Sequence, residues 1–395
     1  MTREIVFLSG IRTPFGKQNG SFKGLSATDL AVEAANAAIT RAQIDPGQVD
    51  HCIVGNVLQT SPDAIYLARH VALRANMGEE TPAVTVNRLC GSGFESVVQG
   101  AHRILLGEAD VVLAGGTESM SQAPHVLRDI RGGVRFGTEP TLHDTLWEAL
   151  YDPVADSPMA MTAERLGEQY GVTREDCDQF ALRSQQTYQA ALERGVFADE
   201  IAPVTLKSRK GERTVEHDEH PRPEADLESM ATLPAYFKKG GLVTAGNASG
   251  IVDGAAAIVM ASADWATSHN HTPIGRLVGW GVTGCDPRIM GIGPAPASRQ
   301  ALEKAGLSLG DIDLIEVNEA FAPQYLAVER ELELDRERTN VNGGAIAVGH
   351  PLGATGTRIT LHLLHELARR GGGKGLGTAC IGGGQGIAVI VEVDG

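Results

Sequence analysis

The feature that most constrains this chain is an internal repetition, in which two stretches separated by roughly 260 residues follow the same plan. Residues 31–50 carry alanines at helical spacing, then a turn, then an aliphatic segment that leads into HCIVGNVL. Residues 297–313 repeat this order and lead into LIEVNEAF. The separation is too long for a solenoid repeat, so it predicts a duplicated domain.

Two glycine-rich turns repeat at a similar separation. TVNRLCGSGFESVV begins at Thr85, and NVNGGAIAVGHPLGATGTRIT begins at Asn340. Each is followed by a predicted long helix and then by a short aliphatic strand that ends in glycine, ADVVLAGG in the first copy and KGLGTACIGGG in the second. Chance richness in alanine and glycine would not match both the element order and the turn positions, so duplication is the better interpretation.

Within each copy the predicted strands alternate with helices, which indicates an α/β class with largely parallel strands covered on both faces. The segment from about 120 to 245 interrupts this alternation with charged stretches such as KSRKGER and EHDEHPRPEADLES. We interpret it as an inserted loop or lid region that could cover a site. The expected halves are therefore 1–270, including the insertion, and 271–395.

Composition excludes several classes of protein. The chain has 395 residues, of which 42% are hydrophobic, so it can bury a sizeable core and is not intrinsically disordered. No apolar run approaches the roughly 18 residues that a membrane-spanning helix needs. The net charge of −15 argues against general nucleic-acid binding, although a local basic site for an anionic ligand remains compatible with it.

The cysteines and the N-terminus bear on the compartment. Five cysteines are scattered without any C-x-x-C pair, so neither a disulfide framework nor a metal site is predicted: Cys52, Cys90, Cys177, Cys285 and Cys380. The N-terminal apolar stretch is short and preceded by Glu4, which is not typical of a secretory signal or an Arg-rich presequence. A reducing cytoplasm is the expected compartment, or the mitochondrial matrix if the source is eukaryotic.

Cys90 and His350 are the strongest candidates for chemistry. Cys90 lies where a predicted strand meets the start of a helix, and a helix N-terminus stabilises a thiolate there. A buried, inert cysteine is the alternative. His350 lies in the glycine-rich loop of the second copy, the counterpart of the Cys90 turn, although a lone loop histidine is often structural. Equivalent turns of duplicated halves should approach each other, which would let the imidazole activate the thiol.

Cys380 and Asn318 follow two further predicted strands. Cys380 ends a strand and opens a glycine run, whose backbone N–H groups could hold an oxyanion; filling an apolar core is the alternative role. Asn318, in VNEAF, could form a turn or position a water molecule.

Basic residues gather inside the predicted insertion, where they could attract phosphates or simply be solvated. They are Lys207, Arg209, Lys210, Arg213, Arg222, Lys238 and Lys239. His217 and His220 lie in the neighbouring acidic stretch and are expected to face solvent. The small residues around Ser249 would let a narrow chain lie against the backbone.

These motifs together resemble those of the thiolases. NRLCGSG, TAGNASGIVDGA, VNEAFA, GGAIAVGHPLGATG and CIGGGQG occur in the order expected for that family, and the resemblance runs from RTPFGK at 12–17 to the last strand. SPMAMTAE and FAPQYLAVER are most similar to the mitochondrial-type 3-ketoacyl-CoA thiolases. The resemblance implies two similar βαβαβαββ halves in an α-β-α-β-α layering, with an inserted loop domain.

The resemblance also implies catalytic roles. Cys90 would be acylated, and His350 would take its proton and later activate the thiol of coenzyme A. Cys380 would exchange a proton with C2 of acetyl-CoA. One oxyanion hole would consist of His350 and a water held by Asn318, and the other of the backbone N–H groups of Cys90 and Gly382.

Coenzyme A and acyl-CoA would be substrates, with no permanently bound cofactor. The residues at thiolase substrate-binding positions are Arg222 near the adenine nucleotide, Ser249 near the pantetheine, and Leu150, Met159, Phe237, Ala245, Ala320 and Phe321 along the pantetheine and acyl pocket. Some short-chain biosynthetic thiolases carry a histidine where this chain has Pro158. This departure favours the broader-range 3-ketoacyl type.

Three alternatives remain at this stage. The enzyme could be a biosynthetic thiolase that condenses two acetyl-CoA molecules. It could be a decarboxylating ketoacyl synthase, although those enzymes pair the cysteine with His-His or His-Asn rather than with a second cysteine. A non-catalytic acyl-CoA or lipid carrier is the remote alternative. The family further implies a homodimer or homotetramer.

Overall fold

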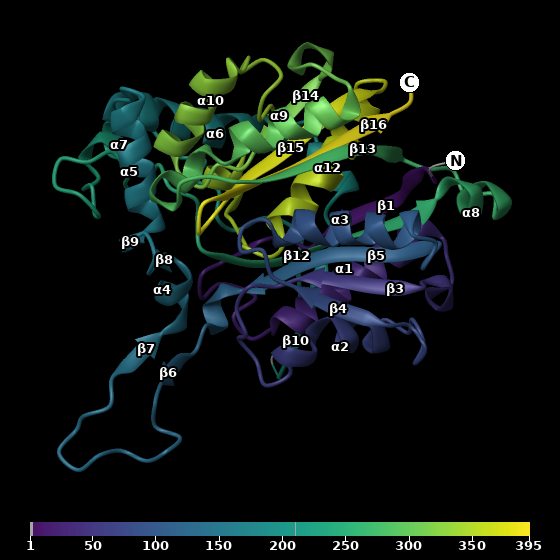
Figure 1. Ribbon diagram of the computed structural model, residues 1–395, viewed down its shortest axis with the longest axis horizontal. Coiled ribbons are helices and arrows are strands. Elements are labelled where there is room, and N and C mark those ends of the chain that lie inside the picture. The colour runs from purple at the N-terminus through teal and green to yellow at the C-terminus, as the bar shows by residue number, and fades with distance from the viewer. Residues whose placement is uncertain (1–2, 210) are drawn as a thin grey trace.

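The computed structural model describes residues 3–209 and 211–395 (Figure 1). Its main feature is a ten-stranded mixed sheet with the strand order β14-β15-β16-β13-β1-β12-β5-β3-β4, to which β2 adds by pairing with β12. Strands β1 and β13 join the two halves of this sheet through the pairs Val6–Arg276 and Phe7–Gly275.

The two halves repeat one order of elements, which confirms the predicted duplication in the fold. The first half contains β1 (Ile5–Arg12), β2 (Gly16–Lys17), α1 (Ala27–Ala42), β3 (His51–Gly55), α2 (Leu67–Arg74), β4 (Ala83–Val86), α3 (Ser92–Leu105), β5 (Val111–Ser119), β12 (Val252–Ser262) and α8 (Ala263–Ser268). The second contains β13 (Gly275–Gly284), α9 (Pro294–Ala305), β14 (Leu314–Val317), α10 (Ala322–Leu332), α11 (Ala345–Val348), α12 (Thr355–Arg369), β15 (Gly373–Ile381) and β16 (Gln385–Val393). The counterpart of β4 is reduced to one parallel bridge between Ile315 and Thr339.

The prediction of largely parallel strands is wrong. Only β3–β4, β3–β5 and β14–β15 are parallel among the described pairs of the main sheet. Strand β12 runs antiparallel to both β1 and β5, and β16 runs antiparallel to both β13 and β15. In the second half the chain returns through the tight β15–β16 hairpin, which can only produce an antiparallel pair. In the first half β12 returns after the insertion and pairs antiparallel with β5 at the corresponding place.

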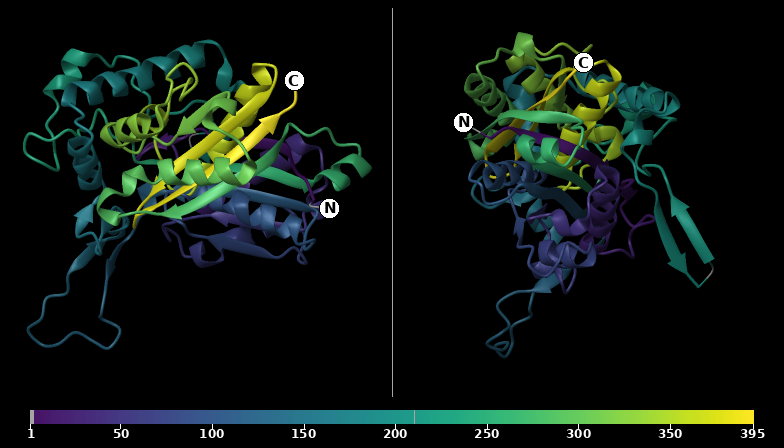
Figure 2. Two further views of the ribbon diagram at one scale, coloured as in Figure 1. Left: turned by 45° about the horizontal axis from the view of Figure 1, so that its top comes forward. Right: turned by 90° about the vertical axis from the view of Figure 1, so that its right-hand side faces the viewer.

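The helices and the two half-sheets form layers (Figures 1 and 2), and three apolar cores lie between these layers. Helices α1 and α2 cover the outer face of the first half, and α9 and α10 cover the outer face of the second. Helices α3 and α12 lie between the two half-sheets, where Phe94 and Ile359 share one core with Ile258 of β12 and Ile387 of β16. This confirms the α-β-α-β-α arrangement.

The central helices approach each other closely because glycine occupies both sides of their contact. A Cβ atom on Gly93 would lie 2.6 Å from the backbone N of Thr357, and one on Gly356 would overlap the backbone N of Phe94. These glycines occupy corresponding places near the starts of α3 and α12. The close approach therefore brings the two helix N-termini, and the loops that precede them, to one place.

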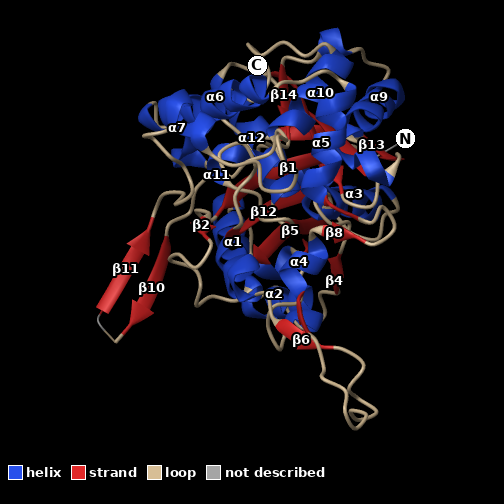
Figure 3. Ribbon diagram, turned by 90° about the vertical axis from the view of Figure 1, so that its left-hand side faces the viewer, coloured by secondary structure: helices blue, strands red, loops and turns tan. Residues whose placement is uncertain are grey.

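The segment between β5 and β12 has more regular structure than a loop or lid. It contains β6 (His125–Leu127), β7 (Leu142–Asp144), α4 (Thr145–Ala149), β8 (Tyr151–Asp152), β9 (Ser157–Pro158), α5 (Met159–Gln169), α6 (Arg174–Glu193), β10 (Val204–Ser208), β11 (Gly211–Val215) and α7 (Leu227–Thr232). Phe180 of α6 stacks on Tyr325 of α10 at 4.0 Å between ring centroids, so part of the segment packs on the second half. The β10–β11 hairpin and the loop between β6 and β7 project outwards (Figure 3).

None of the helices in the described ranges combines the length and the apolar character that crossing a membrane requires.

Candidate active site

Cys90 lies in a tight turn between the end of β4 and the start of α3. Leu89 adopts a left-handed backbone conformation with φ of 46°, which is uncommon for a bulky apolar residue. The Ser92 hydroxyl closes the turn by accepting from the backbone N of Arg88 at 2.9 Å and donating to the carbonyl of Leu89 at 2.7 Å. The turn therefore presents the thiol in one fixed orientation.

The second half of the molecule packs directly on this turn. A Cβ atom on Gly91 would lie 2.5 Å from the Ile381 side chain, and the backbone N–H of Gly382 stabilises the Cys90 thiolate. Burial nevertheless dominates and raises the pKa of Cys90 to about 11. The backbone N–H groups at the start of the helix therefore do not offset burial, and the thiol needs a base to react.

His350 occupies the loop that precedes α12. Its backbone N donates to the carbonyl of Gly250 at 3.0 Å, and its ring Nδ1 lies 2.6 Å from the Thr355 hydroxyl. Its other ring nitrogen, Nε2, lies 3.4 Å from the side-chain amide nitrogen of Asn318. Burial, followed by the charge of Arg358, lowers the pKa of His350 to about 3. The imidazole is therefore neutral at physiological pH and can accept a proton.

Cys380 and Asn318 approach from the second half-sheet. Cys380, near the end of β15, is buried among Met159, Met290 and Ala320. Burial raises the pKa of Cys380 well above its usual value, and the nearby Cys90 and Cys285 raise it further. The backbone N of Asn318 donates to the carbonyl of Thr378 in β15 at 2.9 Å.

These contacts link the five predicted catalytic residues into one cluster. Cys90 lies by the N–H of Gly382 and close enough to Cys380 to raise the pKa of that thiol, while His350 contacts Asn318, whose backbone is bonded to the same strand that carries Cys380. The cluster thus contains two thiols that are protonated at neutral pH, a neutral imidazole and a carboxamide. Such a set can deprotonate one thiol as a nucleophile and keep the other as a proton donor.

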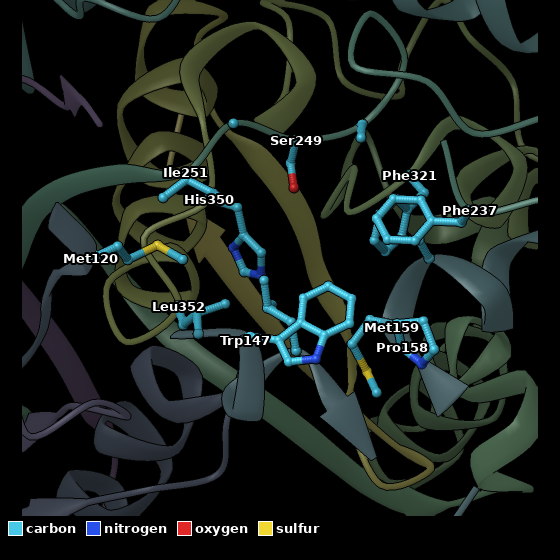
Figure 4. Close-up of a pocket in the computed structure, with 14 residues that line it drawn as sticks. Met120, Trp147, Pro158, Met159, Phe237, Ser249, Ile251, Phe321, His350 and Leu352 are labelled. Carbon is cyan, nitrogen blue, oxygen red and sulfur yellow. The ribbon is translucent and has the colours of Figure 1, made fainter. Parts of the chain in front are cut away.

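An apolar cavity of about 160 Å³ opens beside His350 (Figure 4). Five of the predicted substrate-binding residues line it, namely Leu150, Met159, Phe237, Ser249 and Phe321. In Figure 4 the imidazole projects into the cavity, with the Ser249 hydroxyl above it and the phenyl rings of Phe237 and Phe321 to one side. Apolar walls with a few polar groups are typical of ligand pockets.

A wider and more polar cavity of about 550 Å³ adjoins the first. The two share the wall formed by residues 248–251, and Arg222 and Ala245 line only the wider one. His220 also lines it and lies 2.8 Å from the carbonyl of Ala347, so the prediction that His220 faces solvent is wrong. Together the cavities form a path from a polar mouth to His350.

Comparison with known proteins agrees with this arrangement. A family model described as the thiolase N-terminal domain matches residues 5–264, and one described as the thiolase C-terminal domain matches residues 271–393. The chain belongs to the thiolase family. It is 57% identical to human mitochondrial 3-ketoacyl-CoA thiolase and 47% identical to beta-ketothiolase BktB of Cupriavidus necator, covering at least 99% of each chain in both alignments.

Solved thiolase structures match over nearly the whole fold. The crystal structure of human mitochondrial 3-ketoacyl-CoA thiolase has a TM-score of 0.98 at 57% identity and covers 99% of each chain. The structure of the human enzyme in complex with CoA has a TM-score of 0.97 at 57% identity, covering 99% of this chain and 98% of the other.

Some of the predicted substrate-binding positions of this thiolase lie elsewhere. Ala320 lines neither cavity; it packs beside Cys380, and its carbonyl accepts from the backbone N of Ser249 at 3.0 Å. Of the basic residues in the insertion, only Arg222 lines one of these two cavities. Lys207 pairs with Glu212 at 3.4 Å, Lys238 pairs with Glu168, and Lys210 lies outside the described residues.

Sequence reasoning missed several cavity residues of this thiolase. Met120, Trp147, Ile251 and Leu352 all line the apolar cavity. Leu352 lies two residues after His350, and Ile251 lies two residues after Ser249. Their closeness in sequence to predicted site residues could have identified both. Met120 and Trp147 come from the insertion, and nothing in their local sequence indicates which way they point.

The carboxylate of Glu118 was also missed, although it supports the site. It accepts from the backbone N–H groups of Val57, Leu58 and Gly353 at 2.9–3.2 Å and from the Asn56 amide at 2.9 Å. Burial raises the pKa of Glu118 to about 7, against the effect of these four donors. No nearby basic residue marks this position in the sequence.

Proposed function

We propose that this thiolase converts 3-ketoacyl-CoA and free coenzyme A into acetyl-CoA and an acyl-CoA shortened by two carbons, reversibly, through an acyl group carried on Cys90. The observation that carries the proposal is the cluster of two protonated thiols, a neutral imidazole and a carboxamide beside an apolar cavity. The 57% identity to a mitochondrial 3-ketoacyl-CoA thiolase supports the same acyl transfer.

The first half-reaction places the acyl group on Cys90. Its sulfur attacks the 3-keto carbon while its proton moves to Nε2 of His350. The C2–C3 bond then breaks, its electron pair stays on C2 of the departing acetyl-CoA, and C2 takes the proton of the Cys380 thiol. One proton then passes from the His350 imidazolium to the Cys380 thiolate, so both groups are neutral again. The raised pKa of Cys380 suits a group that must hold its proton until a carbanion develops.

The second half-reaction releases the acyl group. The thiol of coenzyme A gives its proton to His350, and its sulfur attacks the acyl carbonyl on Cys90. The carbon–sulfur bond to Cys90 then breaks, and the leaving thiolate takes the proton from His350. Oxyanions on the two thioesters are stabilised by His350 with a water held by Asn318, and by the backbone N–H groups of Cys90 and Gly382.

Coenzyme A occupies the path formed by the two cavities. Its adenine nucleotide lies in the wider polar cavity beside Arg222, and its pantetheine passes Ser249 towards the cysteines. The walls of this path come from Leu150, Met159, Phe237, Ala245 and Phe321, and Ala320 lies behind them beside Cys380. The support is the shared wall at residues 248–251, which connects the polar mouth with the apolar interior.

The protein acts as a homodimer or homotetramer in a reducing compartment. Strand β4 forms an edge of the sheet, and Val84 on it is 39% exposed, so the edge is available to a second copy of the chain. All five cysteines are unpaired, which fits the cytoplasm or, for a eukaryotic source, the mitochondrial matrix.

Intact mass after incubation with acetyl-CoA tests the acyl-enzyme. We expect one acetyl adduct on the wild-type chain and none on Cys90→Ser. Cys177→Ala removes another buried thiol and is expected to keep the adduct, because Cys177 lies in α6 outside both cavities. An adduct that persists in Cys90→Ser, or its absence from the wild type, would contradict the proposal.

Thiolysis rates across acyl lengths separate the 3-ketoacyl type from an acetoacetyl-CoA synthase. Pro158 lines the apolar cavity where some short-chain thiolases carry histidine, and this favours longer substrates. We expect kcat/KM for medium-chain 3-ketoacyl-CoA to equal or exceed the value for acetoacetyl-CoA. Activity confined to the four-carbon substrate would identify the biosynthetic type instead.

A further inference from the structure

Thr355 is the first residue of α12 and contacts the catalytic imidazole from the side opposite Asn318. Its hydroxyl oxygen lies 2.6 Å from Nδ1 of His350 and 3.1 Å from the carbonyl oxygen of Pro351. Both side chains are buried, with exposed fractions of 1% for Thr355 and 5% for His350. No catalytic role has been assigned to this threonine in the reaction described above.

The hydrogen bonds of the Thr355 hydroxyl indicate which ring nitrogen carries the proton. A threonine hydroxyl has one proton to donate, and the geometry directs it to the Pro351 carbonyl. The hydroxyl oxygen then accepts from the imidazole, so Nδ1 carries the proton of the neutral ring and Nε2 keeps its lone pair. The Asn318 amide lies 3.4 Å from Nε2, but its oxygen is buried without a partner, so the Thr355 contact rather than the Asn318 contact assigns the tautomer.

We propose that Thr355 is a positioning residue that fixes the proton of His350 on Nδ1 and thereby presents the Nε2 lone pair for removal of the Cys90 proton. The inference rests on the proposed thiolase function and adds one residue to it. A neutral imidazole has two tautomers, and only the one with a free Nε2 can act as the base towards the cavity.

The same contact acts again after the proton has moved. When Nε2 takes the proton of Cys90, His350 becomes an imidazolium that donates from both nitrogens. Thr355 continues to accept from Nδ1, so no hydroxyl has to turn during the reaction. Because the site is buried and Arg358 also opposes a positive charge at His350, this acceptor matters more for the imidazolium than for the neutral ring.

The test compares two substitutions at Thr355 with a matched control on the same helix. Thr355→Val keeps the shape but removes the hydroxyl, and Thr355→Ser keeps the hydroxyl. Thr360 is also buried in α12 and donates from its hydroxyl to a backbone carbonyl four residues earlier, at 2.8 Å, without contacting His350. Thr360→Val therefore controls for the loss of such a bond. The measurements are the acetylation rate of Cys90 by acetyl-CoA, and kcat and KM for thiolysis.

We expect Thr355→Val to slow acetylation and kcat by about 10- to 1000-fold, with KM changed less than about threefold, because base catalysis contributes on this scale and substrate binding is untouched. Thr355→Ser should recover most of the rate, and Thr360→Val should stay close to wild type. Thr355→Ala, which is smaller than threonine, replaces the valine variant if that one does not fold.

Three results would overturn the inference. They are wild-type rates in Thr355→Val, an equal loss in Thr355→Ser, or an equal loss in Thr360→Val, which would show that the start of the helix rather than the hydroxyl matters. A wild-type chain that is not acetylated at all would instead refute the proposed function, and the inference would fall with it.

Discussion

The Cys90 turn and the His350 loop occupy corresponding places in the two halves, yet they perform opposite tasks. The turn at 87–91 is short and strained at Leu89, and it presents a thiol whose pKa burial raises to about 11. The loop at 340–354 is longer, contains α11 and uses Gly343 and Gly349 at positive φ, and it presents an imidazole whose pKa burial lowers to about 3. Burial thus keeps both groups uncharged, because it leaves the Cys90 thiol protonated and the His350 imidazole neutral.

Each of the two loops is also held by the opposite half. Arg88, beside Cys90, donates to the Gln385 side chain of the second half at 3.1 Å. Gly353, beside His350, donates to the Glu118 carboxylate of the first half at 2.9 Å. The site is therefore complete only when the two halves are docked, and substitutions on either side of the contact test how far the loops depend on each other.

Replacing the base should give the largest effect. His350→Asn removes the proton acceptor, and we expect kcat to fall by about 10²- to 10⁴-fold, since the Cys90 thiol is then left without a base. In the wild type, kcat/KM should show no loss near pH 6.5, because a pKa of about 3 keeps His350 unprotonated well below that value. Steady-state rates between pH 5 and 8 check both points, and an acid limb near pH 6.5 that His350→Asn abolishes would contradict the assignment.

The same substitution has a predicted effect on stability. Because the folded pKa lies below the usual value, the unfolded chain binds a proton at His350 that the folded chain does not, so stability falls as pH drops from about 6.5 towards 3. At pH 5 this costs the wild type about 2 kcal/mol. His350→Asn should lose that much less stability than wild type between pH 7.5 and pH 5 in urea unfolding. Identical losses in both chains would contradict the lowered pKa.

The loops illustrate how much of the site the sequence could predict. Cys90, His350, Cys380 and Asn318 follow predicted strands or precede predicted helices, and duplication brings the turns of Cys90 and His350 together, so local pattern and symmetry made them candidates. Their expected roles came from the resemblance to thiolases. The strand directions were mispredicted because an aliphatic run indicates a buried strand but not whether the adjacent strand in the sheet runs parallel or antiparallel to it. The sequence does not identify Trp147, Glu118 or Thr355. Their expected roles depend on contacts with other parts of the site, which only the three-dimensional structure shows.

Gly356 is predicted to be a sensitive position in the docking of the halves. Gly356→Ala would force its Cβ against the backbone of Phe94, so α3 and α12 must separate and carry the two loops apart. We expect a loss of about 3 kcal/mol in unfolding free energy and a fall in kcat of at least about tenfold. Gly24→Ala is the control, because its added Cβ meets nothing within 4 Å. A variant with wild-type stability would show that the helices are not in tight contact.

A substitution of Glu118 tests whether its contact from the first half keeps the His350 loop in place. Each of its carboxylate oxygens accepts from two donors, so in Glu118→Gln the new amide N–H₂ must face N–H groups whichever way it turns. We expect about 2 kcal/mol of destabilisation and a several-fold lower kcat, measured by denaturant unfolding and thiolysis. Exposed Glu303→Gln should change neither quantity. Loss of stability without any loss of kcat would mean that the loop keeps its place without this contact.

Trp147 should give the smallest effect, and it concerns the choice of substrate rather than the rate. Its indole lines the apolar cavity opposite Ser249 (Figure 4), yet the side chain is 47% exposed, so its removal should cost little stability. Trp147→Ala widens the cavity at the side next to Met159 and Pro158. We expect kcat/KM for medium-chain 3-ketoacyl-CoA, divided by the value for acetoacetyl-CoA, to change by about three- to tenfold, because a pocket discriminates single methylenes on this scale.

Tyr236→Ala is the matched control for this ratio, since Tyr236 is an exposed aromatic residue that packs against Phe237 but does not line the cavity. It should leave the chain-length profile unchanged. If Trp147→Ala lowers kcat/KM equally for all chain lengths, the indole contacts the coenzyme A portion common to every substrate. Selectivity would then depend on the remaining cavity wall, which includes Met120 directly after β5 and Leu352 in the His350 loop, and so on both halves of the molecule.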